Sequence, residues 1–69
     1  MYEFIYCWAM NGEVKWSSEN ADTLLRRIDN EDEKSLVSEF VEDSEPGNFI
    51  SLSKGILISR VSPILKPTN

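Results

Sequence analysis

The first eighteen residues predict a β-hairpin, because an Asn-Gly pair separates two segments that fit strands. In the stretch MYEFIYCWAMNGEVKW, Asn11 and Gly12 both accept the positive φ angles of a type I′ turn, so Asn-Gly is the strongest short-range hairpin signal. With a two-residue turn, Met10 faces Glu13, and the remaining pairs follow outward along both strands. We therefore expect a hairpin over residues 1–18.

The period of two along a strand assigns the hairpin side chains to two faces. Both faces are largely apolar, which is unusual for a sheet that has water on one side. One face carries a row of large side chains, here named the aromatic row: Tyr2, Phe4, Tyr6, Trp8 and Met10. The other face carries Ile5, Cys7, Ala9, Val14 and Trp16.

The next stretch, SSENADTLLRRID, predicts a short amphipathic helix over residues 19–29. Apolar residues stand at the i, i+3, i+4 and i+7 spacing of one helix face: Ala21, Leu24, Leu25 and Ile28. Ser18 or Asn20 can cap its first turn. The small side chains of Cys7 and Ala9 would let this helix approach the sheet closely, so we expect the helix on their face.

The segment after the charged run at 29–34 fits two structures. Its apolar residues could form a second helical stripe, but Pro46 and Gly47 stand at the central positions of a type II turn that would join two strands. We interpret 35–42 as a strand, with a helix as the alternative, and expect strands throughout 35–61. Pro63 lacks an N–H and should end the ladder, which leaves 62–69 as an irregular tail.

These elements predict one α+β domain over residues 1–69, in the order β-β-α-β-β-β, with a single largely antiparallel sheet and one helix on one face. One helix covers only one face. Four aromatic side chains could present about 600–1,000 Å², whereas the largest apolar patch on a typical monomer is about 300–600 Å². We therefore expect a second copy of the chain over the aromatic row, in a homodimer or a ring. The alternative is that the helix itself covers the row.

The amino-acid composition excludes several classes of site. The chain has one cysteine and no histidine, so a disulfide within the chain is excluded and zinc would lack its usual ligands. We expect no metal and no cofactor. The lone thiol and the lack of a signal peptide fit the cytoplasm. No apolar run approaches the roughly 20 residues of a membrane span, so no membrane association is expected.

Acidic residues dominate the first part of the chain. The formal net charge is −5, and eleven of the twelve acidic residues lie within 1–43. Such a chain is not steered toward nucleic acid, which makes nucleic acid the less favoured partner, but it can meet a protein with a basic surface. Simple solubility explains the same charge. The candidate partner-binding surface consists of Glu19, Asp22, Asp29, Glu31, Asp32, Glu33, Glu42, Asp43 and Glu45.

Catalytic chemistry has little support. General acid–base catalysis would have to use carboxylates, lysine or tyrosine, and the carboxylates at 29–33 are expected on an exposed loop without preorganisation. Cys7 lies within an apolar strand, which suits a small core residue better than a nucleophile. We therefore expect no enzyme, but a small protein-binding module. The alternative is an oligomer that binds nucleotides or single-stranded nucleic acid by stacking on Tyr2, Tyr6 and Trp8.

The stretches MNGEVKWSSENADTLLRRI and FISLSKGILISRV resemble the small accessory proteins of bacteria and their phages. Those proteins often consist of a hairpin, a short helix and further strands. The resemblance implies an accessory role, such as inhibition of a host enzyme or defence system, and it assigns no functional residue.

Overall fold

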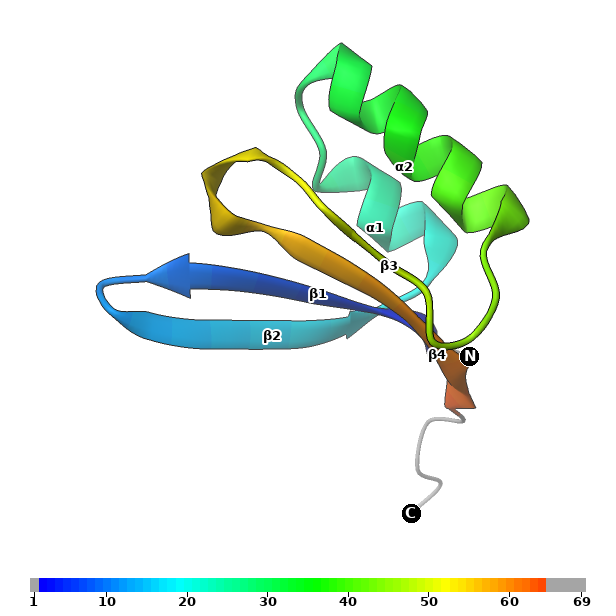
Figure 1. Cartoon of the computed structure of the whole chain (residues 1–69), viewed down its shortest axis with the longest axis horizontal. Helices are drawn as coiled ribbons and strands as arrows, with labels where there is room; N and C mark the ends of the chain where they lie inside the picture. Colours follow the sequence, from blue (N-terminus) through cyan, green and yellow to red (C-terminus); the bar gives the residue numbers. More distant parts are fainter. Residues whose placement is uncertain (1, 65–69) are drawn as a thin grey trace.

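The computed structural model describes residues 2–64 of the 69-residue chain as a four-stranded antiparallel sheet with helices on one side (Figure 1). The strand order is β2-β1-β4-β3, so β1 and β4 are central. The predicted α+β class is confirmed. The elements in chain order are β1 (Tyr2–Met10), β2 (Glu13–Glu19), α1 (Ala21–Arg26), α2 (Glu31–Asp43), β3 (Phe49–Ser51), the 3₁₀ turn η1 (Ser53–Gly55) and β4 (Leu57–Ile64).

The hairpin prediction is confirmed in both turn and register. Asn11 and Gly12 have φ angles of 52° and 80°, as a type I′ turn requires. Met10 pairs with Glu13, and the pairing continues to Phe4 and Glu19. The tip of this hairpin extends beyond the helices (Figure 1).

The first helix is shorter than predicted because Glu19 still belongs to β2. Asn20 caps α1: its side-chain oxygen accepts a hydrogen bond from the backbone N–H of Thr23 at 2.9 Å, and the Thr23 hydroxyl accepts one from the N–H of Asn20. This reciprocal pair satisfies two N–H groups that a helix start leaves free. The predicted apolar stripe is buried, since Leu24 and Ile28 are 0% and 5% exposed.

The strand predicted at 35–42 is wrong, because these residues belong to α2. Asn30 caps this helix by accepting from the N–H of Glu33, and three acidic residues in the first turn stabilise the positive end of the dipole. Val37 and Phe40 lie three residues apart on the buried face. The turn around Gly47, whose φ is +99°, therefore joins a helix to β3.

The predicted end of the ladder at Pro63 is also wrong. Strand β4 runs to Ile64, and its pairing with β1 shifts register between Phe4, which pairs with Arg60, and Tyr2, which pairs with Ile64. Pro63 lies within this irregularity, which is where a residue without an N–H is tolerated. Of the tail predicted at 62–69, residues 65–69 lie outside the described part of the chain.

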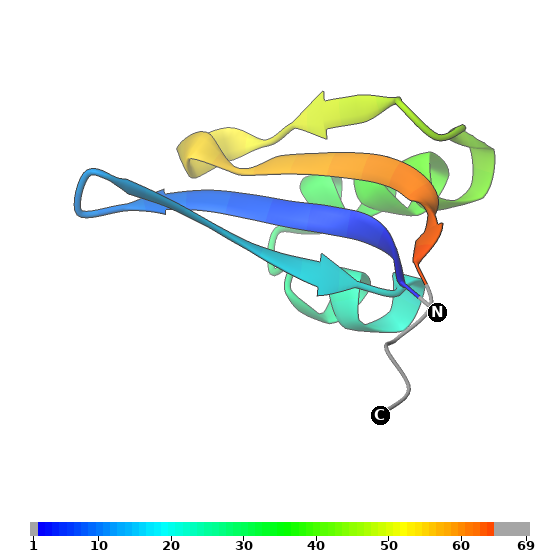
Figure 2. The same ribbon diagram turned by 90° about the horizontal axis from the view of Figure 1, so that it is seen from below.

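Both helices lie on one face of the sheet (Figure 2). This face carries the aromatic row, opposite to the prediction. Phe4 and Tyr6 are 1% and 7% exposed and belong to the core with Leu24, Val37 and Ile58. The expectation that a second chain covers this row is wrong, because α1 and α2 of the same chain bury its central members Phe4 and Tyr6. Of the row, Trp8 packs at the margin of the core, Tyr2 is half-buried and Met10 is 50% exposed near the hairpin tip.

Candidate protein-interaction surface

A groove of about 520 Å³ lies between α2 and the edge strand β3. It has an apolar lining and an acidic rim. Leu36 and Phe40 of α2 and Phe49 and Ile50 of β3 supply the apolar lining. Glu39 and Asp43 stand along the helix side. Leu36 is 45% exposed, so part of this apolar surface is open to a partner. Among residues 2–64, no basic side chain lines the groove.

The free edge of β3 runs along this groove. Arg60 donates its backbone N–H to the Asn48 carbonyl, and the Leu52 N–H donates to the Ile56 carbonyl, so residues 48 and 52 point their backbone groups at β4. Because antiparallel pairs alternate, Phe49 and Ser51 point their N–H and C=O groups away from β4. An extended segment of another protein could pair with these groups as an added strand.

One acidic residue of the groove, Asp43, stands at the end of α2 where the helix dipole opposes it. Glu42 and Asp43 lie in the last turn, which contains no basic residue of its own. Negative charge at this end costs about 0.3–1 kcal/mol per residue. The guanidinium of Arg60 partly compensates by donating to the Val41 carbonyl at 2.9 Å.

The predicted acidic surface is not one continuous patch. Glu19 is only 6% exposed, and Glu33 accepts a hydrogen bond from the backbone N–H of Ser53 at 2.8 Å, which lowers its pKa. The other predicted members are exposed but lie on different elements: Asp22 on α1, Asp29 in the connection, Glu31 and Asp32 in the first turn of α2, and Glu42, Asp43 and Glu45 at its far end.

Sequence reasoning missed Glu39. As part of a strand, residues 36, 39 and 43 fall on no common face, whereas in a helix they form a stripe at i, i+3 and i+7. The signal that could have found this stripe is Asn30 followed by three acidic residues, which marks a helix start.

A second cluster holds the hairpin to α1. The carboxylate of Glu19 accepts from Ser17 and lies 3.2 Å from the Arg27 guanidinium. That guanidinium stacks on the rings of Tyr6 and Trp8 at 4.9 and 5.5 Å. These side chains satisfy one another, so we assign the cluster a structural role.

The Glu19 cluster predicts a loss of stability in acid. Burial alone would raise the pKa of Glu19, but hydrogen bonds from Ser17 and Thr23 and the charge of Arg27 outweigh burial and hold the pKa below its usual 4.5. A lowered pKa means that the folded state prefers the charged carboxylate, so this contribution is present above pH 4.5 and lost as the pH falls through the lowered value. Glu19→Gln should be less stable than wild type at pH 7 and lose less further stability at pH 3.

Urea titrations at the two pH values measure this effect. Glu13→Gln, a change in the exposed residue at the start of the same strand, is the matched control and should follow wild type. An equal acid-induced loss in wild type and Glu19→Gln would contradict the assignment.

Other features of residues 2–64 give less support for a functional site. A cavity of about 340 Å³ between the helices' connection and η1 contains Arg27 and Lys54 together with Asp29 and Glu33, so its charges balance. Within this described part, no three potential metal ligands come together. No helix there is both long and apolar enough to cross a bilayer.

Comparisons with protein-family models, curated proteins and solved structures found no match to this chain. The resemblance to accessory proteins of bacteria and phages therefore stays a prediction, and the groove has to be interpreted from its own chemistry.

Proposed function

We propose that this protein is a small protein-binding module that holds an extended, basic segment of a partner in the groove between α2 and β3. The observation that carries the proposal is the coincidence of three features: a free strand edge, apolar lining and an acidic rim. Backbone pairing with β3 would give affinity, and the alternating side chains of the added strand would give specificity.

The charge of α2 favours this function over simple solubility. Solubility needs acidic residues anywhere on the surface, but Glu39 and Asp43 line a groove with exposed apolar residues. Asp43 also opposes the helix dipole. Local rules of stability are commonly violated where a residue serves binding. The partner segment should therefore carry Lys or Arg beside apolar side chains.

Binding of this kind needs no catalytic group, and we propose a non-enzymatic role. A protein that occupies a basic surface of an enzyme would block that surface, as expected for the inhibitor that the accessory-protein resemblance implies. Stacking of nucleotides or bases on the aromatic row is not favoured, because Phe4 and Tyr6 are buried beneath the protein's own helices.

Peptide titration tests the groove. The probe is a fluorescein-labelled hexapeptide in which Lys or Arg alternates with Val or Phe, and the comparison peptide carries Glu in place of each basic residue. We expect saturable binding of the basic peptide by fluorescence polarisation, weakening with salt. We also expect at least about tenfold weaker binding of the acidic peptide, which corresponds to about 1.4 kcal/mol.

Two variants with the same change in net charge make the test specific to the site. Glu39→Lys with Asp43→Lys should weaken the basic peptide at least about tenfold, or about 1.4 kcal/mol. Asp22→Lys with Asp29→Lys alters carboxylates outside the groove and should change binding much less. Equal losses in both variants, or no saturable binding by wild type, would refute the proposal. Amide shifts in a ¹⁵N spectrum should centre on Phe49 and Ser51.

A further inference from the structure

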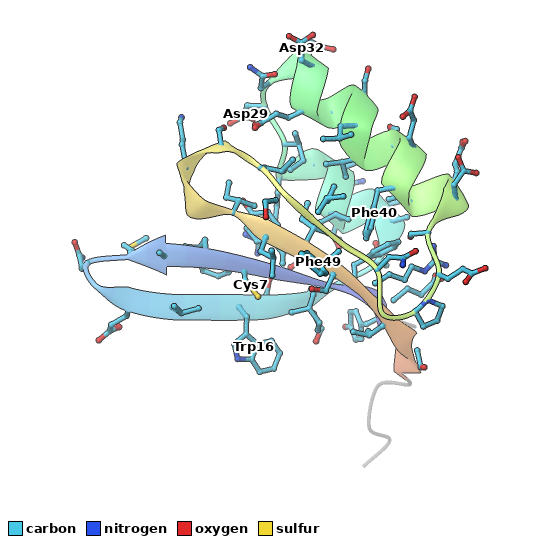
Figure 3. All side chains as sticks on the ribbon, in the orientation of Figure 1. Cys7, Trp16, Asp29, Asp32, Phe40 and Phe49 are labelled. Atoms are coloured by element: carbon cyan, nitrogen blue, oxygen red, sulfur yellow. The ribbon has the colours of Figure 1, made fainter. Side chains whose placement is uncertain are left out.

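The sheet face opposite the helices is apolar and has no cover in the described chain. We name it the open face; its members are Ile5, Cys7, Ala9, Val14, Trp16, Ser18, Phe49, Ser51, Leu57 and Ser59. Trp16 and Cys7 point away from α1 and α2 (Figure 3). Trp16 and Phe49 are each 63% exposed and Val14 is 75% exposed.

The exposed area is close to what a specific interface needs. Aromatic side chains carry about 150–250 Å² each, so Trp16 and Phe49 at 63% exposure present roughly 200–300 Å² together. With Val14 and the partly exposed members, the open face reaches on the order of 600 Å². A standard interface buries about 800 Å² per partner, and the largest apolar patch on a typical monomer is about 300–600 Å².

The charge distribution favours a second copy of this chain as the cover. None of the members named above is charged, and the carboxylate of Glu3, which precedes Ile5 and Cys7 in the alternation of β1, is already paired with Arg60 at 2.8 Å. Nine of the twelve acidic residues lie within 20–48, in the helical layer and its connections. Two copies packed through their open faces would therefore hold these charges on opposite outer surfaces.

The repulsion between two chains of charge −5 is small in this arrangement. The shortest dimension of one chain is 21 Å, so the outer surfaces of a stacked pair lie farther apart than the screening length of about 8 Å at physiological salt. A basic partner would find little to pair with, because the Glu3 carboxylate is already bound to Arg60. An uncharged apolar surface is complementary to itself, and a two-fold axis lets the one surface serve both chains.

We propose that two copies of the chain associate through their open faces into a weak, reversible dimer with two packed sheets. Face-to-face sheets lie about 10 Å apart, and Trp16 of each chain would be buried in the contact. The acidic residues of each groove, Glu39 and Asp43, would remain on the helix side, whereas Phe49 belongs both to the groove lining and to the open face. The predicted homodimer is thus retained as a proposal, but on the face opposite to the aromatic row.

Sedimentation equilibrium over micromolar to submillimolar concentrations tests the dimer. Wild type should approach twice the 7.9 kDa of the single chain with rising concentration. Trp16→Glu should stay monomeric, since each interface would bury two unpaired charges. Trp16 is exposed in the single chain, so this variant should fold, as far-UV circular dichroism would verify.

Leu36→Glu is the matched control, because it places the same charge on an exposed apolar residue of the groove. It should dimerise as wild type does. A monomeric wild type at all concentrations would refute the dimer. So would a dimer that survives Trp16→Glu or is lost in Leu36→Glu. Peptide binding by Trp16→Glu keeps the two proposals separate, because failure of the dimer leaves the groove test unaffected.

Discussion

Phe4→Ala should unfold this domain at room temperature. Phe4 is 1% exposed and its ring lies 6.1 Å from that of Phe40, so it joins the central strand to α2. Truncation of a buried Phe costs about 3–5 kcal/mol. A core of this size rarely supplies more than about 3–5 kcal/mol of net stability. Urea titration followed by far-UV circular dichroism should show no folded baseline for the variant.

Phe49→Ala is the matched control, because it removes the same side chain from a position that is 63% exposed. At protein concentrations too low for association, its free energy of unfolding should lie within about 0.5 kcal/mol of wild type. If the two variants lost equal stability, the assignment of the core to the helix side of the sheet would be wrong.

Arg60→Ala should have the second largest effect, because this one side chain joins three elements. Its guanidinium donates to the Val41 carbonyl at the end of α2 and to the Ser44 hydroxyl, and it pairs with Glu3 on β1. It also lies 4.9 Å above the Phe4 ring. Loss of hydrogen bonds from a charged group, with a carbonyl left unsatisfied, should lower the free energy of unfolding by about 2–3 kcal/mol.

Arg26→Ala controls for the loss of a positive charge. Arg26 is exposed in the last turn of α1, at the negative end of the helix dipole. Its removal should cost about 0.5 kcal/mol. Chemical denaturation of the two variants side by side makes the comparison, and similar midpoints would show that the contacts of Arg60 contribute little.

Local signals in the sequence predicted local structure well. The Asn11-Gly12 turn, the hairpin register, the Asn20 cap and the Gly47 turn depend on residues a few positions apart, and all are confirmed. The strand predicted at 35–42 is wrong because the Pro46-Gly47 turn does not define the segment before it, whereas Asn30 and the acidic residues after it mark a helix start. A type II turn joins a helix to a strand as readily as two strands, so it cannot decide what precedes it.

The face of the sheet that the helices cover could not be predicted from the pattern. Both faces of the hairpin are apolar, so alternation gives no preference, and the decision depends on packing across distant segments. Arg60 and Glu3, separated by more than fifty residues, meet only in the folded chain. The groove depends in turn on α2. Because the sequence pattern predicts a strand at 35–42, it does not predict the groove, and it groups the acidic residues of α2 with those of the other elements as one surface.

The central position of β1 has a consequence for synthesis on the ribosome. One neighbour of β1 follows within a few residues, but the other, β4, begins only at Leu57. The sheet therefore stays incomplete until residue 64 has been translated and released from the exit tunnel. Until then, Phe4 and Tyr6 lack their core contacts with β4. Long-range strand pairing of this kind is slow relative to local contacts. Nascent chains stalled before β4 should accordingly be sensitive to proteases and bind chaperones.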